Sequence, residues 1–188
     1  ISEPLWDLAE TGGGRLRTLR RLQRGQWDPP SVVAARRAQR LVTMARYAGR
    51  TCPFWAERFA ATGQDPNSWR GPEDLSALPI LTKDEIRAHG QELLSRDIPP
   101  SALIKAKTGG STGVALQVHC DSRGVALRGG AALLADTWSG WRLGQPMAAV
   151  WGNPPVARTW KQRLRRTVKS RVIFLDTMRI DDAAIDRF

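Results

Sequence analysis

The sequence predicts an α/β protein in which a helical N-terminal region is followed by part of a mixed layer of strands and helices. Two observations support this class. Before residue 95, apolar residues recur at intervals of three and four, as in helices packed on a core. After residue 100, short apolar runs alternate with segments of helix length, which is typical of a parallel or mixed sheet. A chain of 188 residues, 41% of them hydrophobic, can bury a globular core.

The first thirty residues, 1–30, are expected to form a basic extension. A glycine triplet at 12–14 indicates a link, and a short helix is predicted over 16–26 with leucines along one side. Pro29 and Pro30 end that helix. The extension carries a cluster of five basic residues: Arg15, Arg17, Arg20, Arg21 and Arg24.

Three helices are predicted between residues 31 and 98. Ser31 is expected to cap the first, about 32–48, whose core-facing stripe is Ala34, Ala38, Leu41, Ala45 and Ala48. Pro53 suits the first position of a helix that continues over 54–61 until Gly63 ends it, with its aromatic residues in the core. Thr82 and Glu85 fit a capping box that opens a third helix, to about Leu94.

The second half of the chain is predicted to alternate between strands and helices. Strands are expected at 102–107, 114–119, 147–151 and 172–175. Asp121 or Ser122 is expected to cap a helix over 123–138, which Gly129 and Gly130 weaken unless close packing compensates. A basic helix is predicted over 157–170, and Asp181 and Asp182 open the last helix.

The segment 105–121 is the most informative part of the sequence. Its centre, TGGSTG, places three glycines and three hydroxyl side chains in six residues: Thr108, Gly109, Gly110, Ser111, Thr112 and Gly113. Glycine permits positive φ and close approach of other groups. Hydroxyls and unpaired backbone N–H groups donate hydrogen bonds to phosphate oxygens. With a predicted strand on each side, this segment has the composition of a phosphate-binding loop.

Composition alone leaves a simpler interpretation open, because loops between strands are commonly rich in glycine and serine. Two familiar phosphate-binding patterns are absent. The P-loop requires Gly-Lys-Ser/Thr at fixed spacing, and the dinucleotide fingerprint requires a different glycine spacing before a helix. A phosphate role for TGGSTG therefore needs support from other stretches.

Three further stretches give that support: LPILTKDEI at 78–86, AVWG at 149–152 and RVIFLDTMRIDD at 171–182. Together with TGGSTG, and in this order, they resemble the phenylacetate-CoA ligase branch of the adenylate-forming enzymes, including its CapK-like members. The wider superfamily contains acyl-CoA synthetases, luciferases and nonribosomal adenylation domains. The resemblance covers about residues 30–188.

This resemblance implies a ligase that activates a small carboxylic acid with ATP and Mg²⁺ as an acyl-adenylate, then transfers the acyl group to a thiol such as CoA. It assigns phosphate binding to the loop, 108–113. The adenine-binding segment, the Mg²⁺-holding glutamate motif and the lysine-bearing C-terminal domain are expected beyond Phe188. On this interpretation residues 31–188 are an incomplete N-terminal domain with no catalytic residue, and the chain alone is expected to be inactive.

One departure from the wider superfamily lies directly after the loop. Ala115 and Leu116 occupy positions where general acyl-CoA synthetases have Pro and Lys, as is common among CapK-like members. This removes one possible phosphate contact.

Five residues outside the loop are weaker site candidates. Lys105 and Lys107 share a strand face and add positive potential if they are not simply solvated. For His119 and Asp176 a structural role is favoured over a substrate role, and Trp151 is expected to pack rather than to shape a pocket.

The net charge of +11 is the unusual bulk property of the chain. It suits an anionic substrate such as ATP or CoA, and it also permits an alternative function, a basic module that binds nucleic acid or another anionic surface. For the predicted basic helix, a solvated face is favoured, an anion contact follows, and nucleic acid ranks last as a partner.

Cysteine content and hydropathy indicate the compartment. Cys52 and Cys120 form no CxxC pair or disulfide framework, so a reduced, cytoplasmic setting is expected with both as packing residues. No run approaches the eighteen or so apolar residues of a membrane span.

Overall fold

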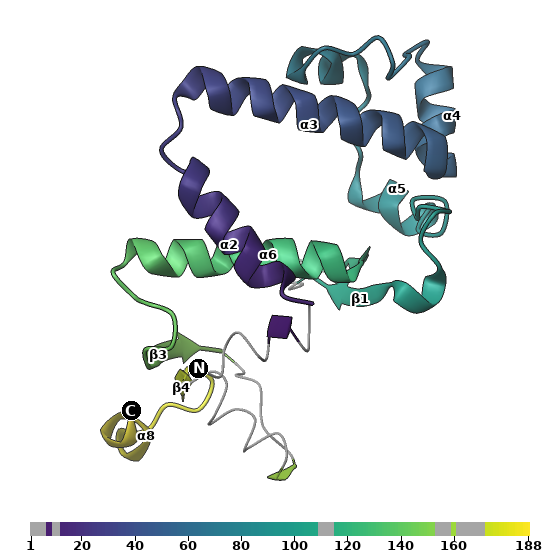
Figure 1. Ribbon diagram of the computed structural model, residues 1–188. Coiled ribbons are helices and arrows are strands. Elements are labelled where there is room, and N and C mark those ends of the chain that lie inside the picture. The colour runs from purple at the N-terminus through teal and green to yellow at the C-terminus, as the bar shows by residue number, and fades with distance from the viewer. Residues whose placement is uncertain (1–6, 9–11, 109–114, 153–158, 161–171) are drawn as a thin grey trace. The chain divides into compact units, whose positions relative to one another are not determined.

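The computed structural model describes residues 7–8, 12–108, 115–152, 159–160 and 172–188 (Figure 1). Among them helices and two small sheets confirm the coarse α/β class. The chain forms two compact units. One is Gly25–Gly124, and the other joins the described parts of Ile1–Arg24 and Val125–Phe188.

The longest helix, α3 (Pro30–Thr51), opens the unit Gly25–Gly124. Its N-cap is Pro29 and no side chain caps it, so the prediction that Ser31 caps this helix is wrong. Proline at the first helical position already has helical φ and has no N–H to satisfy, so the helix begins one residue before Ser31. Helix α4 (Pro53–Ala61) confirms the predicted start at Pro53, and Gly63 follows it with φ of 65°.

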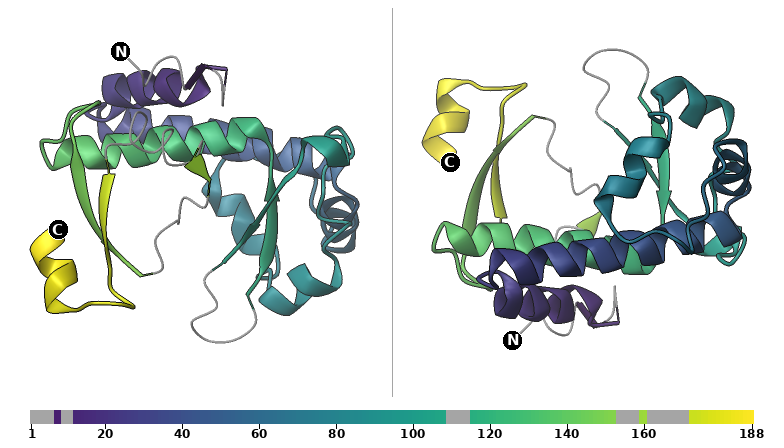
Figure 2. Two further views of the ribbon diagram at one scale, coloured as in Figure 1. Left: turned by 90° about the horizontal axis from the view of Figure 1, so that it is seen from below. Right: turned by 90° about the horizontal axis from the view of Figure 1, so that it is seen from above.

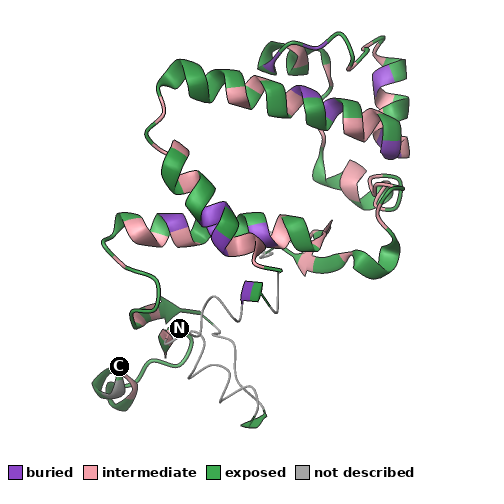
Figure 3. Cartoon of the chain, in the orientation of Figure 1, coloured by how far each residue is buried: buried purple, intermediate pink, exposed green. Residues whose placement is uncertain are grey.

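The core of this unit lies where the C-terminal half of α3 meets α4 (Figure 3). Ala45 of the predicted stripe is buried, whereas Ala34 is exposed. The rings of Phe59 and Trp69 meet edge to face at 5.5 Å between centroids. The buried members of this core are Val42, Ala45, Phe59 and Trp69, with Trp55 and Leu78 packed against them.

Helix α5 (Lys83–Ala88) begins at the predicted capping box but is shorter than expected. The prediction that it continues to about Leu94 is wrong. Gly90 has low helix propensity, and the N–H of Leu94 donates to the carbonyl of Gln91 instead of continuing the helical ladder. The chain turns so that the carbonyl of Glu92 accepts from Phe54, at the start of α4 (3.2 Å). Two short 3-10 helices, η1 (Pro72–Ala77) and η2 (Pro100–Ala102), flank this region.

In the other unit, α2 (Gly14–Gly25) packs against α6 (Ser122–Trp138). Leu16 and Leu19 of α2 are buried against Leu134 of α6, and Leu22 and Leu133 pack beside them. Asp121 caps α6, because its carboxylate accepts from the N–H of Gly124 at 2.7 Å.

The N-terminus of α2 is held by the carboxylate of Asp7, which is 1% exposed. The N–H groups of Leu16 and Arg15 donate to it at 3.0 and 3.3 Å. A carboxylate at this end of a helix satisfies unpaired N–H groups and complements the helix dipole.

The strands β3 (Met147–Trp151) and β4 (Val172–Asp176) pair in parallel, with Met147 opposite Val172 and Trp151 opposite Asp176. This confirms both predicted strands, β4 being one residue longer than expected. Helix α8 (Asp182–Arg187) follows, and Asp181 caps it by accepting from the N–H of Ala184. The predicted basic helix, 157–170, lies outside the described residues except for Thr159 and Trp160.

Candidate functional site

The candidate phosphate loop is carried by a two-stranded hairpin. Strands β1 (Ile104–Lys107) and β2 (Gln117–Cys120) pair antiparallel, with Lys107 opposite Gln117 at the loop end, and they run side by side in both views of Figure 2. This confirms the two strands predicted on either side of TGGSTG, although both strands are shorter than expected.

Thr108 closes the base of the loop. Its N–H donates to the carbonyl of Leu116 at 2.9 Å, and the N–H of Leu116 donates back to Thr108 Oγ1 at 3.0 Å. The hydroxyl of Thr108 therefore acts as an acceptor here and retains its own proton for a ligand. The other five predicted loop residues, Gly109, Gly110, Ser111, Thr112 and Gly113, lie outside the described residues.

One face of the hairpin is polar and carries positive charge. Residues directly opposite in an antiparallel pair share a face, which places Lys105 beside His119 and Lys107 beside Gln117. Both lysines are exposed, and neither forms an ion pair with a described carboxylate. Neither strand contains an acidic residue. This face of the hairpin therefore offers two ammonium groups to an anion, with Lys107 at the loop end.

An open groove of about 930 Å³ lies at the opposite end of the hairpin. Its described lining includes His119 and Cys120 but no residue between Ile104 and Thr108. Apolar side chains such as Met44 and Leu103 line it together with Arg40 and Arg123. The described lining of the groove therefore contains neither Lys105 nor Lys107.

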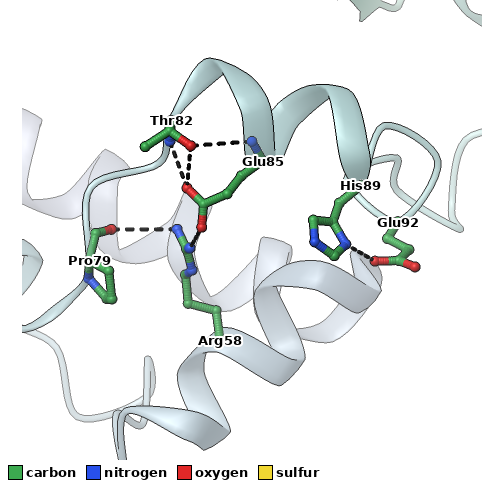
Figure 4. Close-up of polar contacts among 6 residues, drawn as sticks. All are labelled: Arg58, Pro79, Thr82, Glu85, His89 and Glu92. Carbon is green, nitrogen blue, oxygen red and sulfur yellow. Dashed lines mark hydrogen bonds and ion pairs between the residues drawn. The ribbon is translucent and has the colours of Figure 1, made fainter.

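The run LPILTKDEI has a structural role in the described residues (Figure 4). The N–H of Glu85 donates to Thr82 Oγ1 at 3.2 Å, and the N–H of Thr82 donates to the Glu85 carboxylate at 2.8 Å. Arg58 of α4 forms an ion pair with Glu85, and its guanidinium lies 4.7 Å from the ring centroid of Phe54. This run therefore opens α5, as the capping box predicts, and the ion pair between Arg58 and Glu85 also ties α5 to α4.

These hydrogen bonds make the capping box sensitive to acid. The backbone N–H and the hydroxyl of Thr82 lower the pKa of Glu85 below its ordinary value of 4.5, with a further contribution from Arg58. A carboxyl whose pKa is lowered by folding contributes stability above its ordinary pKa, and the contribution is lost as pH falls through the lowered value.

Glu85→Gln is therefore expected to be less stable than the wild type at pH 6, with the difference shrinking as pH falls below 4.5. Urea unfolding midpoints between pH 6 and 3.5 measure this. Glu57→Gln, which removes the same charge from an exposed position of α4, is the control and should change little at pH 6. A gap between Glu85→Gln and wild type that stays constant down to pH 3.5 contradicts the assignment.

The weaker site candidates have different outcomes. Asp176 accepts from the N–H of Met178 at 3.0 Å and so stabilises the turn after β4, as the structural interpretation predicts. Trp151 is 62% exposed, so the expectation that it packs is wrong. It ends β3 on the same strand face as Met147 and Ala149, which are both half-buried. His119 lines the groove rather than the loop end.

The described residues contain no group of three or more His, Cys, Asp or Glu side chains placed to hold a metal ion. Neither Cys52, which is buried, nor Cys120, which is half-buried, is in a disulfide. In the described part of the chain, no helix has the length and apolar character needed to span a bilayer. Comparison of the sequence with known protein families and with curated proteins gave no match in either case.

Proposed function

We propose that this chain supplies the phosphate-binding part of an enzyme that activates a carboxylic acid with ATP as an acyl-adenylate and transfers it to a thiol such as CoA. The observation that carries the proposal is the hairpin β1–β2, whose two strands flank TGGSTG in the sequence and whose first strand carries the exposed Lys105 and Lys107. The order of the four sequence stretches supports it as well.

The chemistry asks the loop to hold negative charge. The substrate carboxylate attacks the α-phosphorus of ATP, the bond to the β-phosphate oxygen breaks, and pyrophosphate leaves. Mg²⁺ bound with ATP neutralises part of its charge. The hydroxyls of Thr108, Ser111 and Thr112 and the N–H groups of the three glycines donate to the departing phosphates. A thiol then attacks the acyl carbon and expels AMP.

The residues present fit this role in two respects. The proton of the Thr108 hydroxyl is not used by the Leu116 contact, whose hydrogen comes from the Leu116 N–H. The lysine ammonium groups on the adjacent face are exposed and have no described carboxylate partner, so a polyphosphate gains attraction without displacing an ion pair.

Binding is tested first, on residues 1–188, by thermal shift with Mg·ATP and with Mg·pyrophosphate. Both are expected to raise the melting temperature, since a ligand at 100 times its Kd stabilises by about 2.7 kcal/mol. Lys107→Gln is expected to weaken both shifts, whereas Lys83→Gln, an exposed lysine on α5, serves as the charge-matched control.

Turnover is tested on the natural protein that contains these residues, by pyrophosphate release with a panel of carboxylic acids. Residues 1–188 alone are expected to bind but not to release pyrophosphate. The proposal fails if neither nucleotide nor pyrophosphate shifts the melting temperature and no acid supports release. If the Lys83 and Lys107 variants lose binding equally, the hairpin face is not part of the binding site.

A further inference from the structure

Helix α2 presents a stripe of four arginines on one face. Arg17, Arg20, Arg21 and Arg24 are all exposed. Their spacing of i, i+3, i+4 and i+7 puts them on the same side of an α-helix, over about 10 Å at 1.5 Å per residue. We call these four residues the arginine stripe.

The stripe has little internal neutralisation. None of its four guanidinium groups forms an ion pair with a described carboxylate, and the sequence has no acidic residue between Glu10 and Asp28. Arg17 Nη2 donates to the carbonyl of Gly12 at 2.9 Å. The other N–H groups of this guanidinium remain able to donate to a ligand. Arg15 differs, because its Nε lies 3.7 Å from the buried carboxylate of Asp7.

The opposite side of α2 fixes the orientation of the stripe. Leu16 and Leu19 are 8% and 6% exposed, and they pack against Leu134 of α6. The N-terminus of α2 is held by Asp7. A helix anchored along its apolar side and at one end presents its charged side with little freedom to rotate.

We propose that the arginine stripe binds the phosphate backbone of nucleic acid, independently of base sequence. Guanidinium groups match phosphate oxygens with paired N–H donors, and every basic residue of α2 is arginine. The length of the stripe, about 10 Å, equals the axial rise of about three nucleotides along one strand. The sequence alone ranks nucleic acid low, and the arrangement of four arginines on one anchored face, none ion-paired with a described carboxylate, favours it.

The same geometry disfavours a membrane as the partner. An amphipathic helix binds a bilayer by burying its apolar face among the lipids. In α2 that face is already buried against α6, so only charge remains for a lipid surface. Stable membrane attachment generally requires a second signal beyond charge.

The test compares two variants of residues 1–188 that each remove four positive charges from the net +11. One carries Arg17→Gln, Arg20→Gln, Arg21→Gln and Arg24→Gln, with glutamine chosen because it preserves helix propensity. The control replaces exposed arginines elsewhere: Arg37, Arg96, Arg142 and Arg179, each to Gln. Fluorescence anisotropy with a labelled 20-base-pair DNA duplex is measured between about 50 and 200 mM salt, with circular dichroism to check folding.

Wild type is expected to bind with a slope of log K against log salt of about −3 to −4, as four neutralised phosphates require. The stripe variant should lose at least about tenfold in affinity at the lowest salt and most of the slope, while the control keeps both. Equal losses in the two variants overturn the proposal in favour of bulk charge. The proposal is also overturned if the wild type does not bind the duplex, whether or not it binds phosphatidylserine vesicles.

Discussion

Replacing the three hydroxyl residues of the loop, by Thr108→Val, Ser111→Ala and Thr112→Val together, is expected to slow the pyrophosphate release of the proposed activity by about 10²–10⁴. A hydrogen bond to a charged group contributes about 1.5–3 kcal/mol, and 1.4 kcal/mol corresponds to a factor of ten. The range assumes that two of the three hydroxyls bond to the departing phosphates.

The measurement is single-turnover pyrophosphate release at saturating acid. Thr108 needs a variant of its own, because its hydroxyl also accepts from Leu116 at the base of the hairpin. Thr108→Ser keeps the hydroxyl and should retain most of the rate, whereas Thr108→Val removes both contacts. Ser101→Ala, at an exposed position before β1, is the control. A triple variant within about threefold of the wild-type rate would falsify the role given to these hydroxyls.

The helix starts that carry local signals could be predicted from the sequence. Pro53 begins α4, and the pair Thr82 and Glu85 begins α5. Asp121 and Asp181 likewise cap α6 and α8. Each signal acts within three or four residues, so the sequence nearby contains all the information that the local structure needs.

Features that depend on distant residues could not be predicted in this way. Helix α5 ends early because the following turn brings the Glu92 carbonyl to the start of α4, a contact across 38 residues of sequence. Trp69 lies in a stretch of turn residues, yet it is 4% exposed because Phe59 of α4 meets it. The periodicity of apolar residues in a helix does not predict which side chain of a loop will pack against that helix.

The candidate site divides in the same way. The phosphate loop is predicted from composition and from one strand on each side; the hairpin confirms the two strands, and residues 109–113 lie outside the described residues. The groove could not be found, because its lining comes from α3, from the turns after α5 and from the base of the hairpin. No spacing rule connects Met44 with Leu94 or His119.

The contact between α2 and α6 depends on a glycine. A Cβ atom added to Gly130 would lie 2.6 Å from the Cβ of Thr18 and 2.7 Å from the carbonyl oxygen of Arg15. The carbonyl oxygen of Arg15 belongs to the backbone of α2, and the Cβ of Thr18 is bonded directly to that backbone. Neither atom can move by a side-chain rotation, so the helices must separate to admit a methyl group. At Gly129 the Cβ would meet the Arg15 side chain, at 2.9 Å from Cδ, and that chain can rotate.

Gly130→Ala is therefore expected to destabilise the unit that contains α2 and α6 by about 2 kcal/mol, although alanine improves helix propensity by up to about 1 kcal/mol. Gly129→Ala should stay within about 0.5 kcal/mol of wild type, because the gain in propensity offsets the movement of Arg15. Urea unfolding followed by circular dichroism measures both variants.

Limited trypsin digestion adds a local measurement, since release of α2 from α6 exposes the bonds after its arginines to cleavage. Cleavage within 15–24 should be faster in Gly130→Ala and unchanged in Gly129→Ala. Equal stability of the two variants would mean that α2 and α6 do not approach closely at Gly130. Close packing would then explain neither Gly129 nor Gly130, which both lower the helix propensity of α6. The expected difference between the two variants instead shows that close packing with α2 requires glycine at position 130 and not at position 129.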